Sequence, residues 1–158
     1  MIIVNSNGKA VKFNEELIRV MGRTASGVKG MNIDGGHIIG MATSTEGKYL
    51  FVISENGYGK KTSIDEYRET SRGAKGVKAS KITDKTGPIA ALKAVNGDEN
   101  CLIMTNAGVV IKIKVDDISN LSRSTQGVRL IKPQENTIVS TITIVNEDEE
   151  EIIEEANE

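Results

Sequence analysis

The sequence has very few of the residues on which several protein classes depend. Its 158 residues include one cysteine, one histidine, two prolines and no tryptophan. A single cysteine, Cys101, excludes an internal disulfide and is typical of a reducing compartment. It lies in the apolar run at residues 101–104, so we expect a buried structural thiol. A single histidine, His37, excludes histidine-based catalytic triads and multi-histidine metal sites, and we expect it in a turn or at a strand edge.

Long apolar and long helical segments are also missing. No apolar run approaches the roughly 18 residues that a membrane span needs, and no secretory leader pattern opens the chain. We therefore expect a cytoplasmic protein with no membrane partner. Sixteen glycines indicate many tight turns. The abundance of β-branched residues, without long stretches of helical period, predicts an all-β fold.

The charge is unevenly distributed along the chain. The formal net charge is −2, but residues 147–158 hold eight acidic and no basic residues. The remaining 146 residues carry twenty basic and fourteen acidic residues, a net charge of +6. We therefore expect a basic folded domain over residues 1–146 and an acidic disordered tail over residues 147–158. The tail is either a solubilising end or a competitor of a polyanion that binds the basic part.

The segment ENGYGKKTS at residues 55–63 resembles a phosphate-binding loop at first sight. The P-loop pattern requires a glycine five residues before the Gly-Lys pair and a Ser or Thr after it. Here those positions hold Ser54 and Lys61. The run at residues 49–53 predicts a strand, and Asn56-Gly57 is a favoured tight-turn pair. We therefore predict the tip of a β-hairpin.

Three pairs of adjacent acidic residues could suggest a metal site or acid–base chemistry. They are Glu15-Glu16, Asp65-Glu66 and Asp116-Asp117. Adjacent side chains point apart in a strand, and each pair precedes an apolar residue. We therefore interpret them as turn or cap residues, and the sequence offers no catalytic or metal-binding constellation.

An internal repeat organises the chain. Gly8, Gly57 and Gly108 are 49 and 51 residues apart, and each is followed 19 residues later by a Gly-Val pair. Strand-like runs lie upstream of the first glycine and downstream of each Gly-Val pair. A period near 50 residues with several strands per unit is typical of propeller-like blades. We place the repeats near residues 2–47, 48–98 and 99–146.

Three positions of the repeat are basic in every copy, and we call them columns one, two and three. Column one is Lys12, Lys61 and Lys112; column two is Arg23, Arg72 and Arg123; column three is Lys29, Lys78 and Arg129. Duplication alone could leave such columns. Because side chains alternate across a strand, however, the apolar neighbours of Lys12 and Lys112 should face inward and these lysines outward.

A recurring row of basic residues favours a regularly charged polyanion, and duplex DNA is the obvious one. Only five aromatic residues are present, mostly in expected strands, which argues against stacking platforms for unpaired bases. No long basic helix is present to read the major groove. The sequence therefore predicts backbone contacts and DNA bending, with little reading of base sequence.

Three long segments carry a family resemblance. MGRTASGVKGMNI (21–33), NGYGKKTSIDEYRETSRGAKGVK (56–78) and TNAGVVIKIKVDDISNLSRSTQGVRLI (105–131) closely resemble the C-terminal domain of bacterial DNA gyrase A. The resemblance runs from about residue 2 to residue 146. It implies a β-pinwheel, a propeller-like disc of four-stranded blades that exchange strands with their neighbours. This chain resembles the last three blades of a disc of about six.

The resemblance also implies a function. In gyrase, duplex DNA wraps around the basic perimeter of the disc, and ATP-driven turnover introduces negative supercoils. The chain itself would bind no cofactor, because ATP and Mg²⁺ act elsewhere in the holoenzyme. Its partners would be duplex DNA and the remainder of gyrase A and gyrase B, and it would be a cytoplasmic, nucleoid-associated bacterial protein. The expected DNA-binding residues are the nine column residues together with Lys60 and Lys75.

Two features depart from the family pattern. Only three repeats are present, and the glutamine-arginine-glycine box of the first blade is absent. The strand-cleaving tyrosine of the family follows an arginine in an upstream domain, whereas Tyr49, Tyr58 and Tyr67 follow Lys, Gly and Glu. We therefore expect no catalysis by the isolated chain. Two alternatives stay open: the C-terminal domain of the related topoisomerase IV, and a propeller-like protein-interaction platform that binds no nucleic acid.

Overall fold

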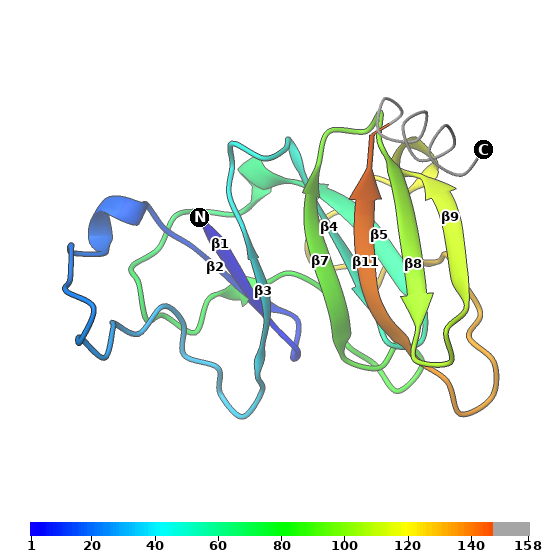
Figure 1. The fold of residues 1–158 in the computed structure, drawn as a ribbon, viewed down its shortest axis with the longest axis horizontal. Helices are drawn as coiled ribbons and strands as arrows, with labels where there is room; N and C mark the ends of the chain where they lie inside the picture. The colour runs from blue at the N-terminus through cyan, green and yellow to red at the C-terminus, as the bar shows by residue number, and fades with distance from the viewer. Residues whose placement is uncertain (147–158) are drawn as a thin grey trace.

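A computed structural model describes residues 1–146, and the acidic tail predicted for residues 147–158 lies outside the described residues. The fold is all-β, as predicted, with three antiparallel sheets that follow one another along the long axis of the molecule (Figure 1). The strands are β1 Ile2–Asn5, β2 Lys9–Lys12, β3 Ile38–Ala42, β4 Tyr49–Ser54, β5 Tyr58–Ser63, β6 Val77–Lys78, β7 Ile89–Val95, β8 Asn100–Thr105, β9 Val110–Lys114, β10 Val128–Arg129 and β11 Val139–Val145. Three short 3₁₀ helices are η1 Glu15–Leu17, η2 Ile64–Glu66 and η3 Val115–Asp117.

Each repeat contains a hairpin whose turn depends on its glycine. Gly8, Gly57 and Gly108 have φ of +72°, +81° and +80°, a conformation that side chains other than glycine rarely adopt. The N–H of Gly57 donates to the carbonyl of Ser54, which closes the turn between β4 and β5. The hairpin predicted at residues 55–63 is therefore confirmed, and the glycine spacing sets the period of the fold.

The three acidic pairs all lie in the first turns of the 3₁₀ helices. Asn14 and Ser63 accept the N–H groups of Glu16 and Asp65 and so cap η1 and η2. The interpretation of these pairs as turn and cap residues is confirmed. His37 is exposed and immediately precedes β3, and its N–H donates to the hydroxyl of Ser6, so its predicted place at a strand edge is confirmed as well.

Neighbouring repeats exchange a strand. The strand order is β3-β1-β2-β6 in the first sheet and β10-β5-β4-β7 in the second. The strand β6 follows the second hairpin in the chain but completes the first sheet, and β10 follows the third hairpin but completes the second. The last sheet has three strands, in the order β11-β8-β9. Each outer strand therefore comes from the next repeat, which is the exchange that the family resemblance implies.

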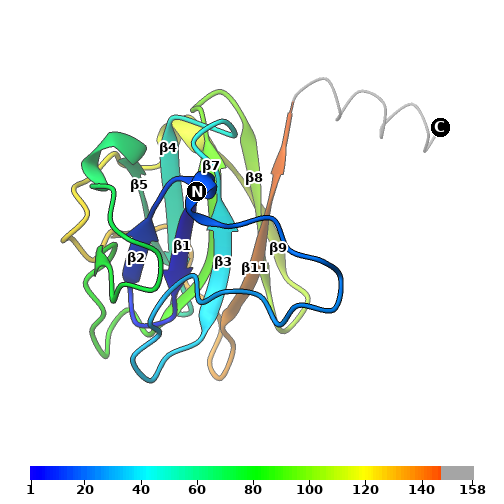
Figure 2. The same cartoon turned by 90° about the vertical axis from the view of Figure 1, so that its left-hand side faces the viewer.

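Seen along the long axis, β1, β2 and β3 lie in front of the strands of the second sheet (Figure 2). The hydrophobic core lies between successive sheets. Leu50 and Val52 of β4 pack with Ile2 and Val4 of β1 between the first and second sheets. Phe51 and Ile53, on the other face of β4, belong to a second cluster that extends into the third sheet. The strand β4 is thus buried on both faces, which its continuous apolar run at residues 49–53 allows. The thiol predicted to be buried at residue 101 is fully buried in the second cluster, and burial raises its pKa to about 12.

Candidate nucleic-acid interface

The first column of lysines joins one repeat to the next. The Nζ of Lys12 donates to the carbonyl of Ile64 at 3.3 Å, and the Nζ of Lys61 donates to the carbonyl of Val115 at 3.0 Å. Ile64 and Val115 are the first residues of η2 and η3, so the two bonds are equivalent. Lys112, the third member of the column, is exposed on β9.

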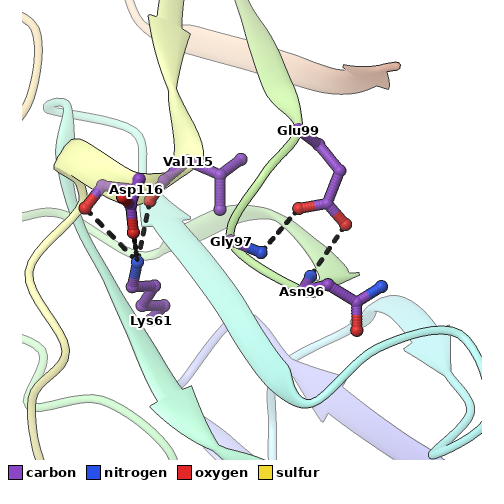
Figure 3. Close-up of polar contacts among 6 residues, drawn as sticks. All are labelled: Lys61, Asn96, Gly97, Glu99, Val115 and Asp116. Carbon is purple, nitrogen blue, oxygen red and sulfur yellow. Dashed lines mark hydrogen bonds and ion pairs between the residues drawn. The ribbon is translucent and has the colours of Figure 1, made fainter. Parts of the chain in front are cut away.

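Lys61 is buried, although the alternation of side chains along β5 predicts that the column-one lysines face outward. Its ammonium lies 3.7 Å from the carboxylate of Asp116, and the side chain is 8% exposed (Figure 3). It also lies 5.7 Å from the ring centre of Tyr49. Residues 119–121 cover this edge of β5, since the N–H of Lys61 donates to the carbonyl of Ser119. Lys61 is therefore an inter-repeat contact, and little of its charge reaches the surface.

Lys60 occupies a core position. It aligns with Val11 and Ile111 of the other repeats, and it is 0% exposed. Its Nζ donates to the carbonyls of Ser122 and Arg123, both at 2.7 Å, and to the carbonyl of Thr125 at 2.9 Å. Burial lowers its pKa to about 8. The ammonium of Lys60 already donates hydrogen bonds to three carbonyls inside the molecule. We therefore leave Lys60 out of the candidate surface.

The second column of arginines also links repeats. The guanidinium of Arg72 donates to the carbonyl of Lys29 at 2.9 Å, and that of Arg123 donates to the carbonyl of Lys78 at 2.9 Å. Each arginine therefore bonds the column-three residue of the preceding repeat. Arg23 is exposed, and its side chain makes no hydrogen bond or ion pair within residues 1–146.

The third column is exposed in all three repeats. Lys78 and Arg129 lie on β6 and β10, the exchanged outer strands, and Lys29 is the equivalent residue of the first repeat. The bonds from Arg72 and Arg123 connect one column-three residue to the next along the chain. These three cations therefore follow one another over consecutive repeats.

Lys9, which the sequence analysis did not single out, joins this surface. Lys9 and Lys78 are directly opposite on the paired strands β2 and β6, and both are exposed. Like charges in this position destabilise a sheet. The equivalent pair of the second sheet is Tyr58 and Arg129, in which Arg129 donates to the Tyr58 hydroxyl at 2.8 Å. Lys9 could not be found from the sequence alone, because its importance depends on the pairing of β2 with β6.

We define the edge-strand basic surface as five exposed cations on or beside the outer strands. They are Lys9, Lys29, Lys78, Lys85 and Arg129. Lys85 lies 5.5 Å from the ring centre of Tyr58, and the Arg129 guanidinium lies 5.1 Å from the same ring centre. None of the five forms an ion pair within residues 1–146. Lys75 is exposed as well but pairs with Asp34 at 3.3 Å.

Comparison with known proteins identifies the family. The sequence matches the family described as DNA gyrase C-terminal domain, beta-propeller, over residues 1–45, 48–96 and 99–146. The chain belongs to this gyrase C-terminal domain family. It is 41% identical over 153 residues to DNA gyrase A of Staphylococcus epidermidis (strain ATCC 12228), and 40% identical over 154 residues to that of Staphylococcus aureus (strain MRSA252). These matches cover 95% and 96% of this chain but 17% of each relative.

Solved structures support the fold of the gyrase C-terminal domain family. A DNA gyrase A C-terminal domain has a TM-score of 0.82 at 24% identity, with 90% of this chain and 49% of that chain covered. The C-terminal domain of a DNA topoisomerase IV has a TM-score of 0.83 at 23% identity, with 99% and 51% covered. The topoisomerase IV likeness concerns the fold, whereas the sequence relatives are gyrase A proteins.

The described part of this gyrase-family chain offers no metal centre. Residues 1–146 contain no group of three or more His, Cys, Asp or Glu side chains arranged to hold a metal ion. In the same range no helix has the length and apolar character needed to cross a membrane. The chemistry available at the candidate interface is therefore that of exposed cations beside backbone and aromatic groups.

Proposed function

We propose that the edge-strand basic surface binds the phosphate backbone of duplex DNA. The observation that supports it most directly is the exposed pair Lys9–Lys78, two cations opposite each other on paired strands with no carboxylate partner within residues 1–146. Such a pair costs stability in the free protein, and neighbouring phosphates offset that cost. The row of column-three cations extends the same contact over three repeats.

In this proposal the cations recognise the charge of the DNA backbone and not the base sequence. The exposed cations lie on short strands and loops, and no helix of the described residues is suited to a major groove, since η1, η2 and η3 span three residues each. A duplex that follows the row from Lys29 to Arg129 must curve with the repeats, so binding and wrapping are coupled.

We further propose that the chain acts as the C-terminal part of gyrase, a type IIA topoisomerase, together with the rest of gyrase A and gyrase B. The chain spans 17% of the length of its curated relatives, so catalysis would lie outside it. In this proposal ATP and Mg²⁺ act elsewhere in the holoenzyme, in the bacterial cytoplasm, and the isolated chain binds no cofactor and catalyses no reaction.

The experiment compares two double variants with the same loss of charge. Lys9→Ala/Lys78→Ala removes the opposed pair, and Lys48→Ala/Lys93→Ala removes two exposed lysines outside the surface. Binding to a duplex of about 40 base pairs is measured by fluorescence anisotropy between about 50 and 200 mM salt. The first variant should weaken binding at the lower salt by about tenfold or more and reduce the slope of log K against log salt by about 2.

The control variant should bind within about twofold of the unchanged protein. Equal losses of DNA affinity in the two variants would show that binding depends on total charge alone, and this would contradict the assigned surface. No binding by the unchanged protein at low salt would favour the alternative of a protein-interaction platform.

A further inference from the structure

The segments that carry the column-two arginines pack on the preceding repeat at two places. We call the contact of residues 71–78 with the first repeat the first joint, and the contact of residues 122–129 with the second repeat the second joint. Both joints contain the same two hydrogen bonds to carbonyls, one from the arginine and one to the residue two positions after it. They are Arg72–Lys29 and Asn32–Ala74 in the first joint, and Arg123–Lys78 and Lys81–Thr125 in the second, with lengths of 2.9 to 3.0 Å.

The side chains enclosed by the two joints differ in chemistry. In the first joint, Val11, Phe13 and Met31 are buried together, and Ala74 packs against them. The aligned residues of the second joint lie 49 residues further on, or 51 for the last one, and all are polar: Lys60, Thr62, Ser80 and Thr125. An apolar cluster at one joint thus corresponds to a polar network at the other.

The polar network of the second joint is held together by hydrogen bonds. The Nζ of Lys60 donates to three carbonyls and one hydroxyl of residues 122–125, at 2.7 to 3.3 Å. The Thr62 hydroxyl donates to the carbonyl of Leu121 at 2.6 Å, and the Ser80 hydroxyl donates to a carbonyl of residues 122–125 at 3.4 Å. All three donating side chains are buried. The ammonium of Lys60 therefore lies at the centre of the second joint.

The two kinds of contact constrain their segments differently. Apolar packing is non-directional, so an apolar joint can shift by small amounts at little cost. A buried polar network that is fully hydrogen-bonded is directional and specifies one arrangement. A buried ammonium that lost its carbonyl partners would be especially costly. We therefore expect the second joint to be rigid where the first can adjust.

The Lys60 network lies between two neighbouring cations of the edge-strand basic surface. Arg123, in the segment that Lys60 holds, donates to the carbonyl of Lys78 on β6. Arg129 follows the same segment on β10 and pairs with Tyr58, which lies two residues before Lys60 on β5. The ammonium therefore connects the strand that carries Lys78 with the strand that carries Arg129.

We propose that Lys60 is a positioning residue of the edge-strand basic surface, which fixes the interval between Lys78 and Arg129 while the interval between Lys29 and Lys78 stays adjustable. Lys60 touches no phosphate itself. For its effect on DNA the inference rests on the proposed function. A duplex that follows the row then meets a fixed interval at the second joint and adapts its curvature at the first.

The first measurement compares the two intervals without DNA. Spin labels on Lys78→Cys/Arg129→Cys report the second interval, and spin labels on Lys29→Cys/Lys78→Cys report the first. The labelled positions are exposed, whereas Cys101 is fully buried. In double electron–electron resonance, the distance distribution of the second interval should be about half as wide as that of the first, or narrower. Equal widths, or a narrower first interval, would overturn the proposal.

The second measurement gives the second joint the residues of the first. Lys60→Val/Thr125→Ala reproduces the contact of Val11 with Ala74. In this double variant the distance distribution of the second interval should widen to about that of the first, and the first interval should not change. An unchanged width of the second interval would overturn the proposal.

A destabilising substitution outside the network is the control. Ile103→Val, in the middle of β8, removes a methyl group from the other core cluster. It should lower the stability of the protein and leave both distance distributions unchanged. Widening of the second interval in this control would mean that any loss of stability loosens the row, and would contradict a specific role of Lys60.

The third measurement tests the consequence for bound DNA. Two dyes about 20 base pairs apart on one duplex report its bending by energy transfer in single saturated complexes. The Lys60→Val/Thr125→Ala protein should give a broader distribution of transfer efficiencies than the unchanged protein. The slope of log K against log salt should change by less than about 1, because no exposed cation is removed.

The outcomes separate this inference from the proposed function. Identical transfer distributions for the two proteins would overturn the role of Lys60 in shaping bound DNA. A complete lack of duplex binding by the unchanged protein would overturn the proposed function. The spin-label distances are measured without DNA, so they decide the positioning by Lys60 in either case.

Discussion

Lys60 shows what decides the role of a single charged residue in this fold. It is fully buried at a position where the other repeats hold Val11 and Ile111, and three carbonyls of residues 122–125 accept its hydrogen bonds. Lys9 and Lys78 have the same side chain, yet they are exposed opposite each other. The difference lies in which carbonyls the next repeat brings close, so residue type alone does not decide whether a lysine is structural or free to bind phosphate.

The burial of Lys60 predicts a pH dependence of stability. Its pKa is lowered from 10.5 to about 8, chiefly by burial. Between these two values the unfolded chain binds more protons at this residue than the folded chain, so the Lys60 contribution to the free energy of unfolding rises with pH. In urea unfolding, the stability of the unchanged protein relative to Lys60→Met should therefore increase from about pH 7.5 to about pH 9.5.

Lys93→Met is the control for this titration. Lys93 is exposed on β7, so the stability of the unchanged protein relative to Lys93→Met should stay nearly constant over the same pH range. A Lys60→Met difference that is flat, or that falls as the pH rises, would contradict the lowered pKa.

At the scale of strands and turns, the sequence predicts what is local and misses what is paired across repeats. The hairpin at Asn56-Gly57 and the capped acidic turns follow from turn chemistry within a few residues. The burial of Lys61 does not, since its partners Val115 and Asp116 lie 54 and 55 residues further along. The core position of Lys60 could have been found by aligning the repeats. The Lys9–Lys78 pair could not, because its register depends on the exchange of β6.

The close backbone approach at the exchanged strand gives a prediction with a matched control. Gly127 and Gly35 both have a φ of +85°, so replacement by alanine costs each about 1–2 kcal/mol of backbone strain. Only Gly127 also faces a carbonyl, that of Gly59, at 2.6 Å from the added Cβ, whereas nothing described lies within 4 Å at Gly35. Gly127→Ala should therefore destabilise the protein by about 1–3 kcal/mol more than Gly35→Ala does.

Chemical unfolding of both variants at equal protein concentration measures this difference. Equal destabilisation would mean that the exchanged strand shifts away from β5 at little cost. A Cβ on Gly76 would lie 2.2 Å from the carbonyl oxygen of Ala10. A similar loss of stability in Gly127→Ala and Gly76→Ala would therefore support the equivalence of the β5–β10 and β2–β6 pairings.

At the scale of the whole molecule, the separation of charge predicts how the proposed DNA binding should depend on salt. The first 146 residues carry a net charge of +6, and the last twelve carry eight acidic residues. If about four to six phosphates are neutralised, log K should fall against log salt with a slope near −4 to −5, nearly independent of base sequence. A slope near zero, or a strong preference for one sequence, would contradict backbone binding.

The acidic end should compete with DNA for the same cations. A chain that ends at Asn146 should bind a duplex more tightly than the full chain at low salt. The gap should narrow as salt screens charges beyond roughly 8–10 Å. Titration of both chains with one duplex at about 50 and 200 mM salt measures the gap. Equal affinities at the lower salt would leave these acidic residues as a solubilising end and would not affect the assigned surface.

The isolated chain should have no effect on DNA topology. It matches the C-terminal domain family and spans 17% of its curated relatives, and residues 1–146 hold no grouped metal ligands. Incubation of the chain with supercoiled plasmid, Mg²⁺ and ATP should leave the distribution of topoisomers unchanged on an agarose gel. Reproducible relaxation or cleavage by the pure protein would contradict this.

The exchange of strands also determines when each sheet can be completed during translation. The first hairpin ends at Lys12, but its sheet is complete only when Val77–Lys78 has been made, and the second sheet waits for Val128–Arg129. At about 5–20 residues per second, the outer edge of β2 stays open for roughly 3 to 13 s during translation. Proteolysis of ribosome-bound chains stalled before and after residue 78 would measure this delay, and equal protection of the first hairpin in both would exclude it. A newly made repeat of this protein must therefore wait for its successor before it is sheltered from other unpaired strands in the cell.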